Sequence, residues 1–518
     1  MSKRYVLALD EGSSSARAIL VDPQGQIVSE ASTPIKAVFP HTGWVELDPW
    51  DLWNAMKEAM DRTMAQARVA ASDIAAVGVT THRETCLIWD RQTGQPVYNA
   101  IMWMSKQTDG IVARWSADGL DDEIRRRTGL RNDSFFSAGK LTWILENVPG
   151  VRDRARQGEL AAGTVETWLL WNLTGGRSHL TDPSSASRTA LFNIGECAWD
   201  EWLCTAYGIP MELLPEVLPS DSCFGYLSAA VLPGGDAASV PVMAILADQQ
   251  AGLFGQACLE LGAAKNTYGT AGVLTVNVGD TPLIVDGLTS SVAWTLGGRT
   301  SYEAEGVVFH SGQTLHWLRD KMRVIDSAES SEALATSVPD NGGVYFVPAF
   351  AGLCDPHWDR QVRGAIVGLT LETGLEHVVR AALEAMAYQT RDNIDALTRG
   401  GVSIPSLKVD GGAIANDFLC QFQADILGLA VQRPYGLERT ALGVAHLAGS
   451  GVGLWKGADD VAATWRVERV FEPTMTEARR EELYGGWQDA VAAARGLPAR
   501  KPISRISPAK NQPLLIPR

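Results

Sequence analysis

One arrangement occurs in both halves of this chain: two short apolar runs flank a polar turn that contains glycine. In the first half, residues 5–10 and 16–22 enclose the turn Glu-Gly-Ser-Ser-Ser. In the second half, residues 264–268 and 273–278 enclose the turn Gly-Thr-Ala-Gly. Apolar, β-branched runs on both sides of such a turn predict a β-hairpin. The recurrence of the hairpin predicts a duplicated α/β plan with a cleft between its two halves.

The segments after each hairpin predict the other elements of a mixed α/β layer. A third strand over residues 26–35 is followed by a helix that Asp48 caps and Pro49 begins. A buried strand is expected over residues 74–80. In the second half, the expected elements are a helix over 377–397, a strand over 406–410 and a helix over 416–427. Three strands, a helix and a strand in this order indicate a mixed sheet and not a Rossmann unit.

The length of 518 residues is too great for one hydrophobic core and predicts two or three domains. A boundary near residues 255–262 divides the chain into an N-terminal domain, 1–256, and a C-terminal domain, 257–495. Residues 496–518 contain five prolines and five cations but no acid. They are expected to form an extended tail or, alternatively, a contact arm for a neighbouring subunit.

Composition and charge exclude several classes of protein. Hydrophobic residues make up 46% of the chain and charged residues 20%, which excludes a disordered protein. The net charge of −15 repels phosphate backbones, so no nucleic-acid partner is expected. The apolar run after the start is too short for a signal peptide, and no uninterrupted run is long enough to span a membrane.

The seven cysteines are scattered and form no CxxC pair. Their spacing indicates neither a zinc site nor a disulfide framework. With no signal peptide or membrane span expected either, the sequence predicts a reduced cytoplasmic protein.

The first hairpin turn carries groups that can hold phosphate. Asp10 ends a strand, where its carboxylate could hold Mg²⁺ directly or through water. Gly12 permits a close backbone approach, while Ser13 and Ser14 offer hydroxyl and amide donors and Arg17 adds a cation. No GxxxxGK[ST] loop and no GxGxxG motif after a strand occurs, so a nucleotide would bind in another way. Alone, this segment also fits a polar turn capped by Asp10.

Three further segments place polar groups at expected strand ends. Arg83 and Glu84 follow the buried strand, Asp248 follows another apolar run, and Gly412 precedes a helix that begins near Asn416. Ligands of α/β proteins bind at the carboxyl ends of strands. Each segment has a structural alternative: a surface ion pair, a helix N-cap and a turn with positive φ, respectively.

Together these segments resemble the FGGY carbohydrate kinase family and, within it, the glycerol kinases. The resemblance runs from about Tyr5 to Trp487, nearly the whole chain. Two stretches fit the family signatures, residues 135–147 and 364–384. The other resembling stretches are residues 10–17, 43–49, 83–85, 265–270 and 410–416.

The resemblance implies a fold and a set of site residues. The fold would be α/β, with two actin-like (ribonuclease H-like) domains whose mixed sheets, flanked by helices, close on ATP and a sugar or polyol. Asp10 would lie next to Mg²⁺. The nucleotide-binding residues would be Ser13, Ser14, Arg17, Thr270, Gly312, Gly412 and Asn416. The polyol pocket would consist of Arg83, Glu84, Trp103, Phe135, Asp248 and Gln249, with Asp248 as the catalytic base.

The resemblance also implies an activity: ATP-dependent phosphorylation of a terminal hydroxyl of a small polyol, with glycerol and glycerol 3-phosphate as the first expectation. A homodimer or homotetramer is implied as well. Two positions depart from the glycerol kinase pattern, because Phe135 stands for Tyr and Val273 stands for Phe. The resulting wider, less polar pocket keeps erythritol, xylulose and dihydroxyacetone open as substrates. A non-metabolic actin-like ATPase and a sugar-binding protein without transfer are the alternatives from other classes.

Overall fold

The structure is a computed structural model that describes residues 4–233, 237–436 and 438–497. Most of the basic tail expected from the sequence, residues 498–518, lies outside the described residues. None of the helices in the described ranges is both long enough and apolar enough to cross a membrane.

The N-terminal hairpin is part of a six-stranded sheet with the order β14-β15-β6-β1-β2-β3. In that order the strands are Gly225–Tyr226, Pro241–Ala247, Ile74–Thr81, Tyr5–Glu11, Ser15–Val21 and Ile27–Pro34. Strands β15, β6 and β1 run parallel, whereas β2 and β3 fold back antiparallel. Strands β1, β2 and β3 precede a helix and then β6, as expected, but two short strands that the sequence did not predict lie between β3 and the helix and belong to another sheet.

Helices from both halves of the sequence cover the two faces of this sheet. On one face lies α1 (Pro49–Ala67), whose buried side chains include Leu52 and Met56. Asp48 caps α1 by accepting a hydrogen bond of 2.8 Å from the Trp50 amide. The other face is covered by α9 (Asp248–Gly255) and α14 (Arg439–Gly451). Thus α14 packs on the N-terminal sheet although it lies late in the sequence.

The C-terminal hairpin is part of a seven-stranded sheet with the order β18-β19-β17-β16-β22-β23-β24. In that order the strands are Thr289–Leu296, Arg299–Val308, Gly272–Gly279, Ala264–Tyr268, Ser406–Asp410, Ala430–Pro434 and Val467–Phe471. Strand β16 pairs antiparallel with β17 and parallel with β22, as β1 pairs with β2 and β6. The two sheets therefore repeat one plan, as the two hairpins predicted.

Several helices and one short pair of strands complete the C-terminal half. The long helices are α12 (Leu375–Arg399), α13 (Asp417–Leu427) and α16 (Glu477–Gly496). The short elements are α10 (Gly312–Trp317), α11 (Ser330–Thr336), β20 (Tyr345–Val347), β21 (Ala365–Val367) and α15 (Ala458–Thr464). The expected helices over 377–397 and 416–427 correspond to α12 and α13.

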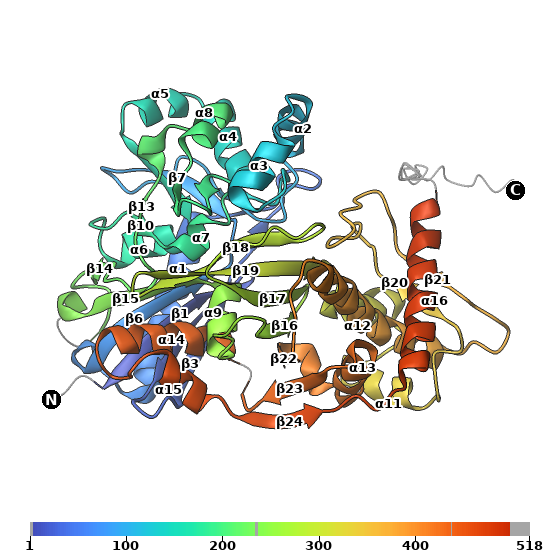
Figure 1. Cartoon of the computed structure of the whole chain (residues 1–518). Coiled ribbons are helices and arrows are strands. Elements are labelled where there is room, and N and C mark those ends of the chain that lie inside the picture. The colour runs from blue at the N-terminus through green and yellow to red at the C-terminus, as the bar shows by residue number, and fades with distance from the viewer. Residues whose placement is uncertain (1–3, 234–236, 437, 498–518) are drawn as a thin grey trace, which may run out of the picture.

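A third body of structure lies above the N-terminal sheet in Figure 1. Its five-stranded sheet comprises β4 (Ala37–Val38), β5 (Glu46–Leu47), β8 (Ala100–Ile101), β7 (Cys86–Asp90) and β9 (Leu160–Thr164). Its helices are α2 (Asp109–Ala117), α3 (Asp121–Thr128), α4 (Ser137–Asn147), α5 (Val151–Arg156), α6 (Val165–Leu173), α7 (Pro183–Ala186) and α8 (Glu201–Tyr207). The sequence did not predict this sheet, in which three strands, β4, β5 and β8, have only two residues and carry too little periodicity.

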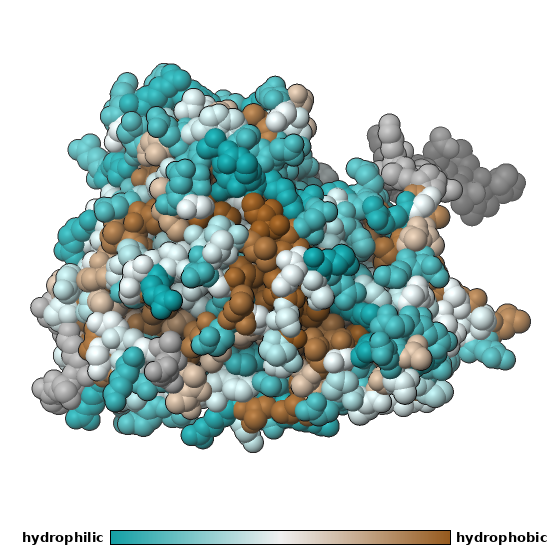
Figure 2. Space-filling view, viewed as in Figure 1, coloured by the Kyte–Doolittle hydropathy of each residue, from teal (hydrophilic) through white to brown (hydrophobic). Residues whose placement is uncertain are grey.

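The middle of the molecule is where the halves meet. Strands β18 and β19 reach from the C-terminal sheet toward the third body (Figure 1), and β18 contacts α7 of that body. Hydrophobic side chains gather on the visible face in this region (Figure 2). The division into 1–256 and 257–495 stays a prediction, and the packing of α14 shows that the second segment also contributes to the core around the first sheet.

Two glycine-to-alanine substitutions should have opposite effects on stability, because Gly443 lies at the close crossing of α9 and α14 and Gly485 lies in α16, away from it. A Cβ at Gly443 in α14 would lie 2.1 Å from the Ala251 carbonyl oxygen, so Gly443→Ala should cost about 1–3 kcal/mol by overpacking. A Cβ at Gly485 in α16 would meet no atom of the described part of the chain within 4 Å, so Gly485→Ala should gain about 0.5–1 kcal/mol. Scanning calorimetry measures both midpoints, and a higher midpoint for Gly443→Ala would contradict the crossing.

Candidate active site

Three parallel strands of the N-terminal sheet end in one row. Asp10 on β1 pairs with Thr80 on β6, and Ala247 on β15 pairs with Thr81. Because the strands run parallel, their carboxyl ends lie at one edge of the sheet. Asp10, residues 82–85 and Asp248 therefore emerge side by side, as their positions at strand ends predicted.

Arg83 and Glu84 lie in a buried network of charges. Their exposed fractions are 8% and 3%, which excludes the surface ion pair that the sequence left open. Arg83 Nη1 lies 2.6 Å from Glu305 Oε2, and Arg83 Nε lies 3.4 Å from Asp248 Oδ1. Glu305 belongs to β19, so a carboxylate of the C-terminal sheet holds an arginine of the N-terminal half.

The backbone at Glu84 adopts an uncommon conformation. Its φ of 64° is left-handed, which costs a residue with a Cβ about 1–3 kcal/mol. The Thr85 amide donates to the Arg83 carbonyl over 2.8 Å, and Ser137 Oγ donates to the Glu84 carbonyl over 3.0 Å. The Glu84 side chain accepts from Arg188 Nε at 2.7 Å. Contacts on both sides thus hold this strained turn in place.

Burial and neighbouring charges shift the acids of the network in different directions. Burial raises the pKa of Glu84, although Arg188 and Arg83 oppose the shift. Burial and the adjacent Glu305 raise the pKa of Glu303 to about 7. Burial alone would also raise the pKa of Glu305, but Arg188 and Arg83 outweigh it and lower that pKa. Glu305 therefore stays ionised between the two arginines.

The first hairpin turn lies against the aromatic wall of the same site. The Gly12 amide donates to the Ser15 carbonyl over 3.0 Å, which closes the turn. Trp103 Nε1 donates to Ser13 Oγ over 2.8 Å, and the Trp103 ring packs edge-on against Phe135 with centroids 5.5 Å apart. The structure therefore brings Ser13, Trp103 and Phe135 together, whereas the side chain of Ser14 is exposed.

Two of the charged groups expected to contact phosphate or metal have protein neighbours. Arg17, expected to contact phosphate, forms an ion pair with Glu438, and both side chains are about a third exposed. Burial raises the pKa of Asp10 to about 6, with Arg17 opposing the shift and Asp248 adding to it. Burial also raises the pKa of Glu11 well above its ordinary value, and neither carboxylate oxygen of Glu11 has a hydrogen-bond partner among the residues that the structure describes.

The donor chemistry at this edge suits a small divalent cation. Mg²⁺ is commonly held by one or two carboxylates together with water and substrate phosphates. Asp10 and Asp248 supply carboxylates close enough to influence each other. Within the described ranges, no three His, Cys, Asp or Glu side chains form a complete metal-binding group. A cation here would depend on oxygen atoms of water or of a bound phosphate compound.

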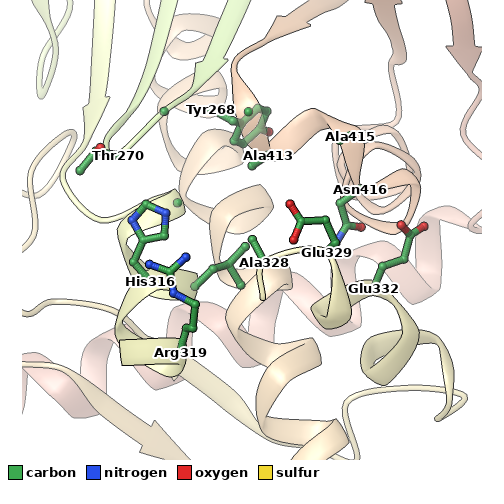
Figure 3. A pocket seen from close by; sticks show the side chains of 14 residues that line it. Tyr268, Thr270, His316, Arg319, Ala328, Glu329, Glu332, Ala413, Ala415 and Asn416 are labelled. Atoms are coloured by element: carbon green, nitrogen blue, oxygen red, sulfur yellow. The ribbon is translucent and has the colours of Figure 1, made fainter. Parts of the chain in front are cut away.

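A cavity of about 420 Å³ lies in the C-terminal half. Its lining includes all four residues expected there to bind nucleotide, Thr270, Gly312, Gly412 and Asn416. In Figure 3, His316 and Arg319 lie on one wall, and Glu329 and Asn416 on the other. Asn416 also caps α13 through a bond of 2.9 Å from the Leu419 amide.

The local backbone requires glycine at Gly312, which lines this cavity, and at Gly411, which precedes the lining residue Gly412. Gly411 has a φ of 92°, and a Cβ there would lie 2.5 Å from the Tyr268 carbonyl oxygen. A Cβ at Gly312 would lie 2.7 Å from the Gly269 carbonyl oxygen, to which the Gly312 amide donates over 3.0 Å. Side chains at Gly411 and Gly312 would push the second hairpin away from the cavity wall.

Comparison with known proteins shows the family. Residues 5–255 match the N-terminal domain of the FGGY family of carbohydrate kinases, and residues 264–452 match its C-terminal domain. The chain belongs to the FGGY family of carbohydrate kinases. The family resemblance seen in the sequence and the expected two-domain α/β fold are confirmed.

Relatives and solved structures agree with this assignment. A Symbiobacterium thermophilum protein named glycerol kinase is 49% identical over 96% of this chain and 99% of its own length. A Carboxydothermus hydrogenoformans protein of the same name is 50% identical over 96% and 99%. The Plasmodium falciparum glycerol kinase structure with ADP has a TM-score of 0.89 at 31% identity, covering 95% of this chain and 98% of that chain. A Lactobacillus acidophilus xylulose kinase shares the fold, with a TM-score of 0.86 at 20% identity, covering 95% and 98%.

Several residues of this FGGY site were not singled out from the sequence. Lys265, noted only within a resembling stretch, donates from Nζ to Gln249 Oε1 at 2.5 Å and to Thr267 Oγ1 at 2.8 Å. Burial lowers the pKa of Lys265, with Asp410 and Asp248 opposing. Glu303 and Glu305 were missed entirely, although two acids at alternate positions of an apolar strand face the same side and could have signalled a buried role.

The raised pKa of Asp10 predicts that its carboxylate destabilises the ligand-free fold. Between 3.8 and about 6, folded Asp10 keeps a proton that the unfolded chain loses, so stability falls as pH rises through this window. Asp10→Asn should therefore raise the unfolding midpoint near pH 8, with an upper limit of about 3 kcal/mol. The gain should vanish near pH 4.

Thermal unfolding in a metal chelator over a pH series measures this effect. Asp22→Asn is the matched control, because the Asp22 carboxylate lies in an exposed turn and accepts from the Gln24 and Gln26 amides at 2.9 Å. The control should show no gain at high pH. An Asp10→Asn midpoint below that of the unaltered protein near pH 8 would refute the prediction.

Proposed function

We propose that this protein is an ATP-dependent kinase that phosphorylates a terminal hydroxyl of glycerol and forms glycerol 3-phosphate. The observation that carries the proposal is the meeting of Asp248, Arg83 and Glu84 at one sheet edge, beside the Ser13 turn. Relatives named glycerol kinase, 49–50% identical over nearly the whole chain, support the choice of substrate.

Asp248 is the proposed catalytic base. Its side chain is 27% exposed, so a small alcohol can reach the carboxylate, while the other acids of the network are buried. A polyol hydroxyl is a weak nucleophile and benefits when a carboxylate accepts its proton during phosphoryl transfer. Lys265 fixes the neighbouring Gln249 through its Nζ, which orients the first turn of α9 that carries Asp248.

Arg83 and Glu84 are the proposed holders of the substrate hydroxyls. An arginine can only donate hydrogen bonds, and an ionised glutamate can only accept them. Arg83 can therefore donate to a hydroxyl oxygen of the substrate, and Glu84 can accept the hydrogen of an adjacent hydroxyl. The edge-on pair of Trp103 and Phe135 supplies an apolar wall for the carbon chain.

The 420 Å³ cavity is the proposed nucleotide site, with Thr270 and Gly312 at the phosphates and Gly412 and Asn416 at the adenosine. Ser13, Ser14 and Arg17 would contact the transferred phosphate. Mg²⁺ held near Asp10 would neutralise phosphate charge during transfer. Phosphate binding would compete with Glu438 for Arg17 at low cost, because an exposed ion pair contributes only about 0–1 kcal/mol.

The identity of residue 135 bears on which polyol binds best. A phenolic hydroxyl at this position could bond a substrate oxygen, and Phe135 lacks it. Such a bond contributes about 0.5–1.5 kcal/mol, or about three- to tenfold in affinity. Val273, at the start of β17, leaves more room than a phenylalanine would. Erythritol, xylulose and dihydroxyacetone are therefore the competing substrates. A cytoplasmic location and a homodimeric or homotetrameric state complete the proposal.

A coupled ADP-release assay tests the activity and the base together. Across glycerol, dihydroxyacetone, erythritol, xylitol and xylulose, glycerol should give the highest kcat/KM. Asp248→Asn should lower kcat by about 10²–10⁴, the usual contribution of a general base. Binding of metal-free ADP, measured by calorimetry in a metal chelator, should stay unchanged and serves as the folding control. ATP turnover that does not depend on any polyol would favour the actin-like ATPase instead.

Gly412 offers a clean test of the nucleotide site. A Cβ at this position would meet none of the described atoms within 4 Å, so Gly412→Val should fold normally while its side chain occupies part of the cavity. We expect the Kd for ADP to rise about tenfold, equivalent to about 1.4 kcal/mol. The ligand-free unfolding midpoint should match that of the unaltered protein. Unchanged ADP affinity would place the adenosine elsewhere.

A further inference from the structure

Arg188 belongs to none of the motifs that the sequence predicts to form the site. It follows α7 by two residues, and only 1% of its surface is exposed. Its Nε lies 2.7 Å from Glu84 Oε1, and its Nη2 lies 2.8 Å from Glu305 Oε1. The guanidinium also lies over the Phe136 ring, 5.5 Å from the centroid. Arg188 therefore bridges two buried carboxylates and has no direct access to solvent.

The two oxygens of Glu305 serve different arginines. Oε1 pairs with Arg188, while Oε2 lies 2.6 Å from Arg83 Nη1. Arg83 in turn points its Nε toward Asp248. Glu84, Arg188, Glu305, Arg83 and Asp248 thus form one continuous chain of contacts. Arg188 therefore orients both residues that are proposed to bind the polyol: Glu84 directly, and Arg83 through Glu305.

Loss of Arg188 would change the charge state of this chain. The Glu84 carboxylate faces Arg188, Arg83, Glu305 and Lys140. Of the cations, Arg188 most strongly opposes the burial that raises the pKa of Glu84. Without it, Glu84 would take up a proton at higher pH and could no longer accept two hydroxyl hydrogen bonds. The left-handed turn at Glu84 would also lose its side-chain anchor.

We propose that Arg188 is a positioning residue for the polyol: it holds Glu84 directly and Arg83 through Glu305, without touching the substrate. This inference rests on the proposed function, because it assigns Glu84 and Arg83 to substrate hydroxyls. It assigns no role to Arg188 in nucleotide binding. The contact chain crosses from the N-terminal half to β19 of the C-terminal sheet, so both halves contribute to the geometry of one small-molecule pocket.

The test compares full-length Arg188→Gln and Arg188→Lys with the unaltered protein in steady-state kinetics over a pH series. Arg188→Gln should raise the KM for glycerol about tenfold to a hundredfold, the usual effect of losing a charged hydrogen bond. The pH below which glycerol affinity declines should move upward, because Glu84 becomes easier to protonate. The Kd for ADP should stay within about twofold of the unaltered value. Arg188→Lys should recover part of the affinity by keeping the positive charge.

Arg127→Gln is the matched control. Arg127 also pairs with a buried aspartate, Asp200, at 2.9 Å, but it contacts no residue of the contact chain. This control should leave the KM for glycerol and its pH profile unchanged. If Arg188→Gln does not fold, Arg188→Lys provides the test. A lysine keeps the charge but cannot pair with both carboxylates as the guanidinium does, so its KM for glycerol should rise while its Kd for ADP stays unchanged.

Three outcomes would overturn the inference, and they differ from failure of the proposed function. The first is a folded Arg188→Gln protein with unchanged KM and pH profile for glycerol. The second is an equal loss of glycerol and ADP affinity, which indicates a general structural role. The third is the same effect in Arg127→Gln. If the unaltered protein phosphorylates no polyol of the assay panel, the proposed function falls and this inference falls with it.

Discussion

The desolvation of charge between the two halves is the constraint on which this site depends. Ionised groups removed from water are costly unless partners satisfy them, and removing one partner is more costly still. Arg83, Arg188, Glu84, Glu303 and Glu305 are all at least nine-tenths buried, so they must be paired with one another. Gln250 and Ser291 complete the set by donating to Glu303 Oε1 at 2.8 Å. The pairing fixes the direction of each group more strictly than packing alone would.

Several features at the same edge of the sheet lower the stability of the ligand-free fold. Loss of hydration raises the pKa values of Asp10 and Glu11, and Glu84 has a left-handed backbone. None of these features helps the ligand-free chain to fold. In the proposed function a cation and a polyol would supply the missing partners, and groups already held in place would need little rearrangement on binding.

Much of this arrangement could be predicted from local sequence, and the rest could not for physical reasons. The hairpins, α1 and the strand ends depend on short-range patterns, so Asp10, Arg83, Glu84 and Asp248 were found at one edge. Arg188 and Glu305 lie more than a hundred residues apart, and no local signal indicates that they meet. The packing of α14 on the first sheet is likewise a contact between distant segments. The deep burial of Arg83 and Glu84 depends on these long-range contacts. Local sequence alone therefore could not exclude that the two residues form a surface ion pair.

The contacts between the halves differ greatly in what they cost to break. At β19 the contacts are buried ion pairs, and separating them would leave uncompensated charges in a dry interior. At the first hairpin the corresponding contact is Arg17 with Glu438, about a third exposed and readily replaced by water or phosphate. Breaking the pair of Arg17 and Glu438 therefore costs less than breaking the ion pairs at β19. Arg83 and Glu84, the residues proposed to bind the polyol, can keep their geometry when the exposed pair breaks, because Glu305 continues to pair with both Arg83 and Arg188.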